Sequence, residues 1–292
     1  MARILDLDRS QLVALRGRSL TDAAAAAEGR TLAAEVIPGA PVLVDGIENL
    51  ELVAAHGADL IILNFVEQVW GDEGWRFPVL GPLADLAELA QIVGRPIGIN
   101  LEPGEVPEPR RATTENARRL IDAGAAMLCL TANPGTGTTF DDLARATSEL
   151  RGALGADAAL WVGKMHQAGH TELITPDALA RLVDAGADGV LVPLPGTVPG
   201  VTRELGAALC AAIHDRGAIV MGTVGTSQEG ARPAIAQQLA LLAKEIGVDV
   251  HHLGDAGLGR VTDPDLLYEY SIAIRGRRHT WRRMALGGRH AT

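Results

Sequence analysis

Seven glycines divide most of the chain into units of similar length. Each glycine ends a stretch with helical hydrophobic periodicity and precedes a short apolar run, as in HGADLIILN and AGADGVLVP. The successive spacings are 37, 30, 31, 31, 31 and 30 residues for Gly57, Gly94, Gly124, Gly155, Gly186, Gly217 and Gly247. A glycine at a helix C-terminus can take the left-handed backbone that ends the helix before a strand begins. The repeat therefore predicts alternating helices and strands.

The runs after these glycines, together with an earlier run at residues 31–37, give eight predicted strands. The strands are apolar throughout, which is typical of a parallel sheet covered on both faces. Eight equal units in about 250 residues predict a single (β/α)8 barrel over residues 30–292, preceded by a helical extension at residues 1–29. The competing fold is a doubly wound open sheet, but nothing interrupts the repeat and no GxGxxG follows the first strand.

Charge and composition exclude several classes of protein. The chain has 292 residues and a formal net charge of −10, whereas a nucleic-acid-binding protein is usually basic. No apolar run approaches the roughly 18–20 residues of a membrane-spanning helix, and the first residues lack the apolar core of a secretory signal. We therefore expect a cytoplasmic protein that binds neither nucleic acid nor membranes. Cys129 and Cys210 are expected to be buried free thiols.

Polar residues follow nearly every predicted strand. In this fold the carboxyl ends of the strands build the active site, so these residues are the candidates. We expect substrate-binding roles for Asn64, Asn100, Asn133, His252 and Asp255.

Lys164 is the most informative of the strand-end residues. The chain has 24 arginines and only two lysines, so a lysine at a strand end indicates a need for its amine. A desolvated lysine can lose its proton and form an imine with a carbonyl group, which arginine cannot do. The alternatives are an ion pair with Glu102 or Glu35, or a contact to a phosphate. The second lysine, Lys244, lies in a predicted surface helix.

Three further residues complete a predicted catalytic set with Lys164. His166, Glu35 and Glu102 are candidates for moving protons, although a histidine packed in the barrel mouth is the alternative for His166. The same three with His252 could instead bind a divalent metal. No HxH or HExxH spacing supports a metal, so the preferred hypothesis requires no cofactor.

Two glycine-rich loops after the last two strands are candidates for phosphate binding. Their accessible backbone N–H groups and hydroxyls suit an anion, and many barrels bind phosphate at these loops. The residues concerned are Gly225, Thr226, Ser227, Gly254 and Gly257. The alternative is that these glycines only permit tight turns.

Two segments lie outside this pattern. Residues 66–83 contain Trp70, Trp75 and Phe77, which suggests a lid over the site or a subunit contact, and with it a homo-oligomer. Residues 275–290 contain six arginines and no acidic residue, which we expect to pack against a helix or a neighbouring subunit.

Several strings together resemble a known family over nearly the full chain. They include GRTLAAEVI, VGRPIGINLEP, LTANPGTG, GKMHQAG, PLPGTVPG, GTVGTSQEGA and HHLGDAG. The family is an uncharacterised bacterial TIM-barrel family, often labelled phosphoenolpyruvate phosphonomutase-like and associated with sugar phosphotransferase systems. The resemblance implies a barrel and a phosphorylated, sugar-like substrate. The Asp-x-Asp pair and the cysteine-bearing loop that are typical of the mutases are replaced here by INLEP, LTANP and GKMHQAG.

The sequence thus predicts an enzyme that acts on a small phosphorylated sugar or keto acid. The preferred reaction is that of a carbon–carbon lyase or aldolase using Lys164 as its amine. The first alternative is a metal-assisted isomerase, epimerase or phosphonomutase-like enzyme. The second is a non-catalytic protein that binds sugar phosphates.

Overall fold

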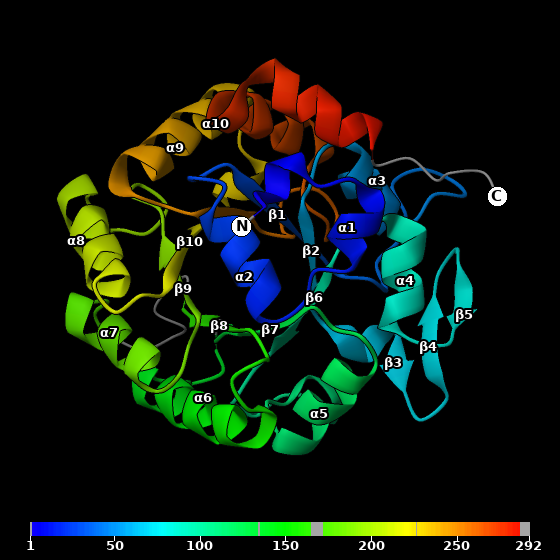
Figure 1. The fold of residues 1–292 in the computed structure, drawn as a ribbon, viewed down its shortest axis with the longest axis horizontal. Helices are drawn as coiled ribbons and strands as arrows, with labels where there is room; N and C mark the ends of the chain where they lie inside the picture. Colours follow the sequence, from blue (N-terminus) through cyan, green and yellow to red (C-terminus); the bar gives the residue numbers. More distant parts are fainter. Residues whose placement is uncertain (1, 134, 165–171, 226, 287–292) are drawn as a thin grey trace.

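Eight parallel strands close into a barrel (Figure 1). The computed structural model describes residues 2–133, 135–164, 172–225 and 227–286. Around the barrel the strands follow one another in chain order, which confirms the predicted (β/α)8 fold. They are β1 (Thr31–Val36), β2 (Leu60–Leu63), β6 (Ile97–Leu101), β7 (Met127–Leu130), β8 (Leu160–Gly163), β9 (Gly189–Pro193), β10 (Ile219–Val224) and β11 (Val250–Leu253).

Helices surround the barrel, as the glycine repeat predicts. All seven glycines have positive φ, between +74° and +110°. This left-handed backbone favours glycine, so the glycine repeat reflects a conformational requirement at the end of each helix. Single 3-10 turns occur in the loops at Val66–Gln68, Glu108–Arg110 and Gln228–Gly230. The outer helices are α3 (Asn49–Ala55), α4 (Leu86–Val93), α5 (Thr114–Asp122), α6 (Phe140–Leu154), α7 (Pro176–Asp184), α8 (Arg203–His214), α9 (Pro233–Ile246) and α10 (Pro264–Ala285).

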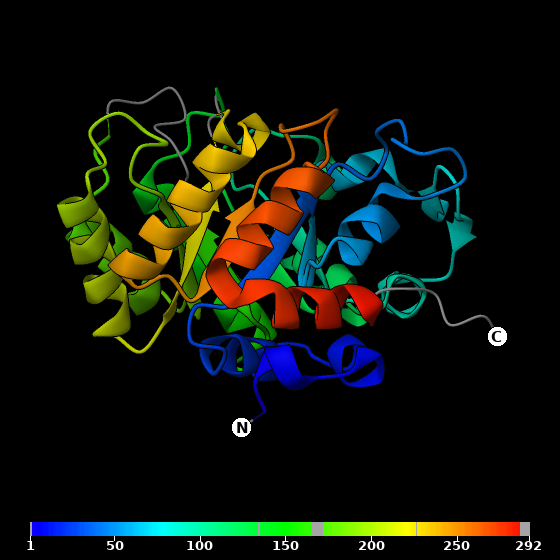
Figure 2. The same ribbon diagram turned by 90° about the horizontal axis from the view of Figure 1, so that it is seen from above.

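The N-terminal segment closes the amino-terminal end of the barrel. Its 3-10 turn (Ile4–Asp6), α1 (Arg9–Val13) and α2 (Arg18–Ala25) lie beneath the strands in Figure 2. Their apolar side chains form one buried cluster with inward-facing barrel residues such as Met127 and Trp161. A second cluster joins the outward-facing residues of the strands to the helices. The lower barrel is thus filled with apolar side chains, which leaves the carboxyl end of the strands as the place for a polar site.

The segment between β2 and α4 forms a small antiparallel sheet. Its strands are β3 (Trp70–Gly71), β4 (Gly74–Phe77) and β5 (Gly81–Leu83), beside α4 in Figure 1. The expectation that its aromatic side chains form a lid or subunit contact is corrected here. Trp70, Trp75 and Phe77 stack on one another, with neighbouring ring centroids 5.4 and 6.4 Å apart, and are buried in the chain's own core.

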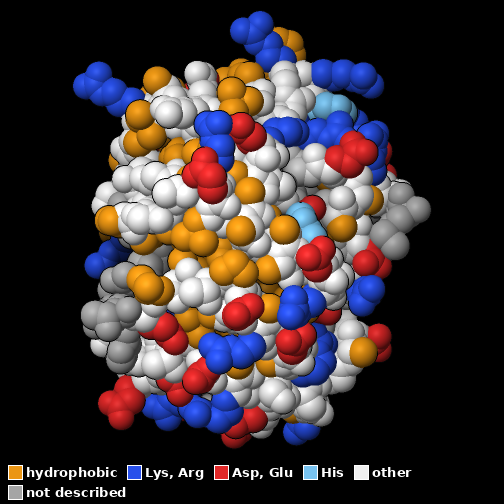
Figure 3. Space-filling model, turned by 90° about the vertical axis from the view of Figure 1, so that its left-hand side faces the viewer, with side chains coloured by type: hydrophobic (Ala, Val, Ile, Leu, Met, Phe, Trp, Pro, Cys, Tyr) orange, Lys and Arg blue, Asp and Glu red, His pale blue; other side chains and the backbone are white. Residues whose placement is uncertain are grey.

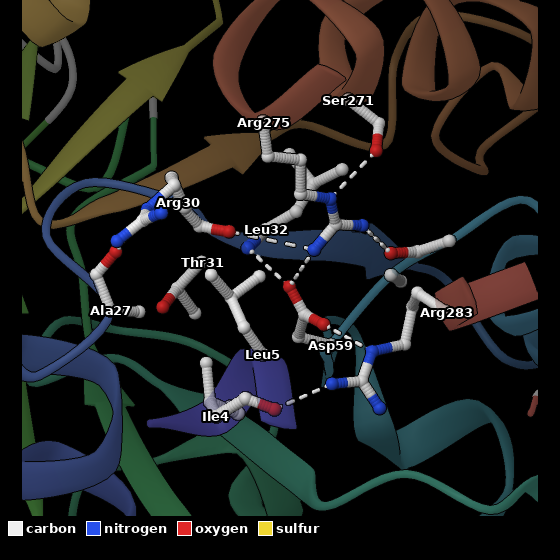
Figure 4. Close-up of polar contacts among 12 residues, drawn as sticks. Ile4, Leu5, Ala27, Arg30, Thr31, Leu32, Asp59, Ser271, Arg275 and Arg283 are labelled. Carbon is white, nitrogen blue, oxygen red and sulfur yellow. Dashed lines mark hydrogen bonds and ion pairs between the residues drawn. The ribbon is translucent and has the colours of Figure 1, made fainter. Parts of the chain in front are cut away.

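Two arginines of the C-terminal segment are buried around Asp59 (Figure 4). Arg275 Nη1 lies 2.5 Å from Asp59 Oδ2, and Arg283 Nε lies 2.6 Å from Oδ1. Arg283 also donates to the main-chain oxygen atoms of Ile4 and Leu7 in the N-terminal segment. The described part of the arginine-rich segment therefore packs within the chain and joins α10 and the N-terminal segment to the barrel.

One side of the surface, the two cysteines and the lengths of the helices agree with the expectations from the sequence. On the side of the molecule that carries α7 and α8, apolar side chains gather near the centre, with charged side chains around them (Figure 3). Cys129 and Cys210 are buried and free, as expected. Within the described ranges, no helix combines the length and apolarity needed to cross a bilayer.

Candidate active site at the barrel mouth

A chain of hydrogen bonds crosses the carboxyl end of the barrel. Asn64 Nδ2 donates to Asp255 Oδ2 at 3.1 Å, and Asn100 Nδ2 donates to Asn64 Oδ1 at 3.0 Å. Thr131 Oγ1 donates to Asn100 Oδ1 at 2.7 Å. Asn64, Asn100 and Thr131 stand at the ends of β2, β6 and β7, where alternation along the strand turns them inward, and Asp255 comes from the loop after β11. The structure brings together three of the predicted substrate-binding residues, Asn64, Asn100 and Asp255.

Glu35 and His252 face each other beside this network. Their Oε2 and Nε2 atoms are 3.7 Å apart, and both side chains are more than nine-tenths buried. Nδ1 of His252 has no hydrogen-bond partner among the described residues. The pair comes from β1 and β11, which are neighbours only because the barrel closes.

Burial sets the protonation of this pair. It raises the pKa of Glu35 well above the ordinary value, and the charge of Asp255 raises it further. Burial also lowers the pKa of His252 to about 4. At neutral pH His252 is therefore neutral, so the contact is not an ion pair. A carboxylic acid that can donate a proton lies beside an imidazole that can accept one.

Two more carboxyl groups lie close to Glu35. Burial raises the pKa of both Asp255 and Glu229. A Cβ atom placed on Gly254 would be 3.6 Å from Glu229 Oε1 and 3.7 Å from Glu35 Oε2, so this glycine lies between them. Sequence reasoning missed Glu229, whose position after the seventh strand, in GTSQEG, was the available signal.

Glu102 holds two loops together. Its Oε2 accepts a hydrogen bond from the backbone N–H of Asn133 at 2.9 Å, and its Oε1 accepts from Asn133 Nδ2 at 2.7 Å. Arg110 lies 3.3 Å from Glu102 and 3.3 Å from Glu67, with its guanidinium 4.0 Å from the Phe65 ring centroid. Glu102 and Asn133 therefore bind each other. Arg110 was not predicted, because nothing in PEPRR marks which arginine turns inward.

Lys164 lies away from the Glu35–His252 pair. Trp161 faces the barrel interior, so alternation along β8 turns Lys164 outward towards the helices. Its Nζ donates to the main-chain oxygen of Thr138 and to Glu172 Oε2, both at 3.0 Å, and lies 5.1 Å from the Phe140 ring centroid. Lys164 thus makes an ion pair, as one alternative for this residue held, but its partner is Glu172 and neither Glu102 nor Glu35.

The glycine-rich loops are packed closely. The N–H of Gly254 donates to the main-chain oxygen of Val224 at 3.0 Å. A Cβ on Gly257 would lie 2.4 Å from the main-chain oxygen of Glu229, so no larger residue fits there. Gly225 and Ser227 lie at the same end of the barrel, and Ser227 has a φ of +83°. Thr226 and His166 are outside the described residues. A phosphate role for these loops stays a prediction.

A divalent metal at the barrel mouth, the alternative interpretation of the same residues, stays a prediction. Among the described residues, no group of three or more His, Cys, Asp or Glu side chains is arranged to hold one. Of the predicted ligands, Glu35 and His252 are adjacent, Glu102 is engaged by Asn133 and Arg110, and His166 is not described.

Known structures of similar fold include lyases and aldolases. A 2,3-dimethylmalate lyase of the PEP mutase/isocitrate lyase superfamily aligns with a TM-score of 0.53 and 16% identity, over 87% of this chain and 83% of that one. An archaeal fructose 1,6-bisphosphate aldolase aligns with a TM-score of 0.51 and 16% identity, over 85% and 94%. A putative fructose-1,6-bisphosphate aldolase from Coccidioides immitis aligns with a TM-score of 0.55 and 15% identity, over 94% and 96%.

At these identities the similarity establishes the barrel fold. No curated protein matches the sequence significantly. A family model described as a domain of unknown function (DUF7916) matches residues 5–289. The chain therefore belongs to the DUF7916 family.

Proposed function

We propose that this protein is a carbon–carbon lyase of the aldolase type, with Glu35 and His252 as its acid–base pair. The observation that carries the proposal is the buried contact between these two groups at the carboxyl end of the barrel strands. The lyases and aldolases of similar fold support the reaction class by analogy. The proposed substrate is a small sugar or keto acid with a hydroxyl group on the β-carbon, the carbon two bonds away from its carbonyl carbon. That this substrate carries a phosphate group is a hypothesis from the sequence.

The proposed reaction needs one proton acceptor and one proton donor. Neutral His252 removes the proton of the substrate hydroxyl, and the adjacent carbon–carbon bond breaks as a new carbonyl forms. The bonding electrons pass into the second fragment as an enolate, which takes the proton of Glu35. Asn64 and Asn100 keep Asp255 in place beside the pair through their hydrogen bonds.

Lys164 has no covalent step in this proposal. Its Nζ is engaged by Glu172 Oε2 and by the main-chain oxygen of Thr138, both at 3.0 Å, and alternation along β8 turns the side chain away from the Glu35–His252 pair. Borohydride reduction during turnover distinguishes the two mechanisms, since a substrate adduct on Lys164 would restore the imine mechanism and remove this one.

The proposal is tested by following carbon–carbon cleavage by NMR with 2,3-dimethylmalate, fructose 1,6-bisphosphate and related aldols. With a substrate found, Glu35→Gln and His252→Gln should each lower kcat about 10²–10⁴-fold, because each removes a proton-transfer group. Glu73→Gln, at an exposed position of the β3–β4 turn, is the matched control and should leave kcat unchanged. Full activity in both active-site variants would rule out the assigned pair.

A further inference from the structure

A cavity lies beside β8 and β9, lined by residues of α6 and α8 and of the segments that directly precede α7 and α8. Its volume is about 270 Å³, and Lys164 and Glu172 are among its lining residues. Most of the wall is apolar, with contributions from Phe140, Ile174, Val198, Val201 and Leu205. Neither Glu35 nor His252 is among the described residues that line it. We call it the side cavity.

The polar end of the side cavity combines two features that favour an anion. Lys164 supplies a positive charge on a side chain that is only 1% exposed. The N-terminus of α6, a helix of 15 residues, supplies the backbone N–H of Phe140. Exposed backbone N–H groups at the start of a helix favour negative charge. A buried ammonium and a helix N-terminus thus converge on one point.

Glu172 occupies that point in the structure. Its Oε2 accepts from Lys164 Nζ at 3.0 Å and from the Phe140 N–H at 3.0 Å. Unlike Lys164, the Glu172 side chain is 29% exposed, so it can turn into solvent while the lysine stays in place. The buried ammonium of Lys164 therefore stays in the cavity wall, whereas another carboxylate can take the place of Glu172.

We propose that the side cavity binds a small organic carboxylate with a branched apolar body, and that the ligand's carboxylate replaces Glu172 as the partner of Lys164. The apolar body then fills the space between Phe140, Val198 and Leu205. This volume suits a compact acid of a few carbon atoms. The site is separate from the Glu35–His252 pair and does not depend on the lyase proposal.

Because the chain has only two lysines, binding at Lys164 can be followed directly by NMR. Protein labelled with 13C at lysine Cε gives two lysine signals, which the Lys244→Arg variant assigns. Titration with 4-methylpentanoate should shift the Lys164 signal to saturation and leave that of Lys244 in place. The uncharged 4-methylpentanamide should not produce this shift. An equal shift with the amide, or no Lys164 shift with the acid, would overturn the proposal.

Variants separate the role of each charge. Glu172→Gln removes the competing carboxylate, so calorimetry should show 4-methylpentanoate binding about tenfold more tightly. Lys164→Met, checked for folding by circular dichroism, should abolish binding. If it does not fold, the Glu172→Gln result decides, because an unchanged affinity contradicts the exchange of partners. Glu35→Gln should bind the probe like the wild type, and a loss there would place the probe in the barrel mouth instead.

Discussion

At the residue scale, burial shifts the pKa values of Glu35 and His252 in opposite directions, upward for the acid and downward for the imidazole. Both groups are enclosed by the barrel, and an enclosed group loses the hydration that stabilises its charged form. Burial therefore favours the protonated form of Glu35 and, by lowering the pKa to about 4, the neutral form of His252. The catalytic proposal depends on this combination of states.

The same burial predicts how stability depends on pH. The folded pKa of Glu35 lies above the unfolded value of 4.5, so its contribution to stability is present below pH 4.5 and is lost as the pH rises towards the folded pKa. Glu35→Gln should therefore stabilise the fold at pH 8, by about 1.4 kcal/mol for each unit of pKa shift, and by much less at pH 4. Urea unfolding at both pH values measures the difference, and an equal effect at the two would contradict a raised pKa.

At the scale of elements, the glycines that end the helices act through backbone conformation. Gly217 follows α8 with a φ of +78°, and a Cβ there would meet no atom within 4 Å. Gly217→Ala should cost about 1–2 kcal/mol from the left-handed backbone alone. Gly152 lies inside α6, also in open space, so Gly152→Ala should stabilise by about 0.5–1 kcal/mol. Thermal unfolding of both variants checks this, and effects of the same sign would show that the argument fails.

The loops after β6 and β7 depend on one carboxylate. Glu102 accepts two hydrogen bonds from Asn133 and neutralises buried Arg110. Glu102→Gln should destabilise by about 1–3 kcal/mol, because it weakens the hydrogen bonds from Asn133 and leaves buried Arg110 with Glu67 as its remaining carboxylate among the described residues. Chemical unfolding measures the loss. Glu105→Gln, an exposed carboxylate in the same loop, is the control, and a loss as large there would contradict the assigned role.

At the scale of the whole molecule, the Asp59 cluster joins segments from both ends of the chain. Burial alone would raise the pKa of Asp59, but the charges of Arg275 and Arg283 outweigh it and hold the pKa below 3.8. The stabilisation is therefore present above pH 3.8 and lost as the pH falls through the lower, folded pKa. When acid protonates Asp59, the N-terminal segment should therefore detach in the same transition in which the barrel unfolds.

Asp59→Asn tests this connection. It leaves the two arginines buried without a carboxylate, so it should destabilise by about 3–5 kcal/mol. Since Arg283 also holds Ile4 and Leu7, limited proteolysis should cut the N-terminal segment first in the variant. Asp22→Asn removes a partly exposed partner of Arg18 and serves as the control. Equal proteolysis of the two variants would mean that Asp59 does not anchor this segment.

The sequence by itself determined the barrel, because its signals are local. A glycine that needs positive φ follows each helix whatever the rest of the chain does, and continuous apolar runs mark strands buried on both faces. It also located Glu35, Asn64, Asn100, His252 and Asp255 at strand ends. Only the tertiary structure decided which of these meet. The direction of Lys164, the approach of Glu229 to Glu35, and the joining of Asp59 to Arg275 depend on closure of the barrel. Closure brings together residues whose separation in the chain carries no local signal.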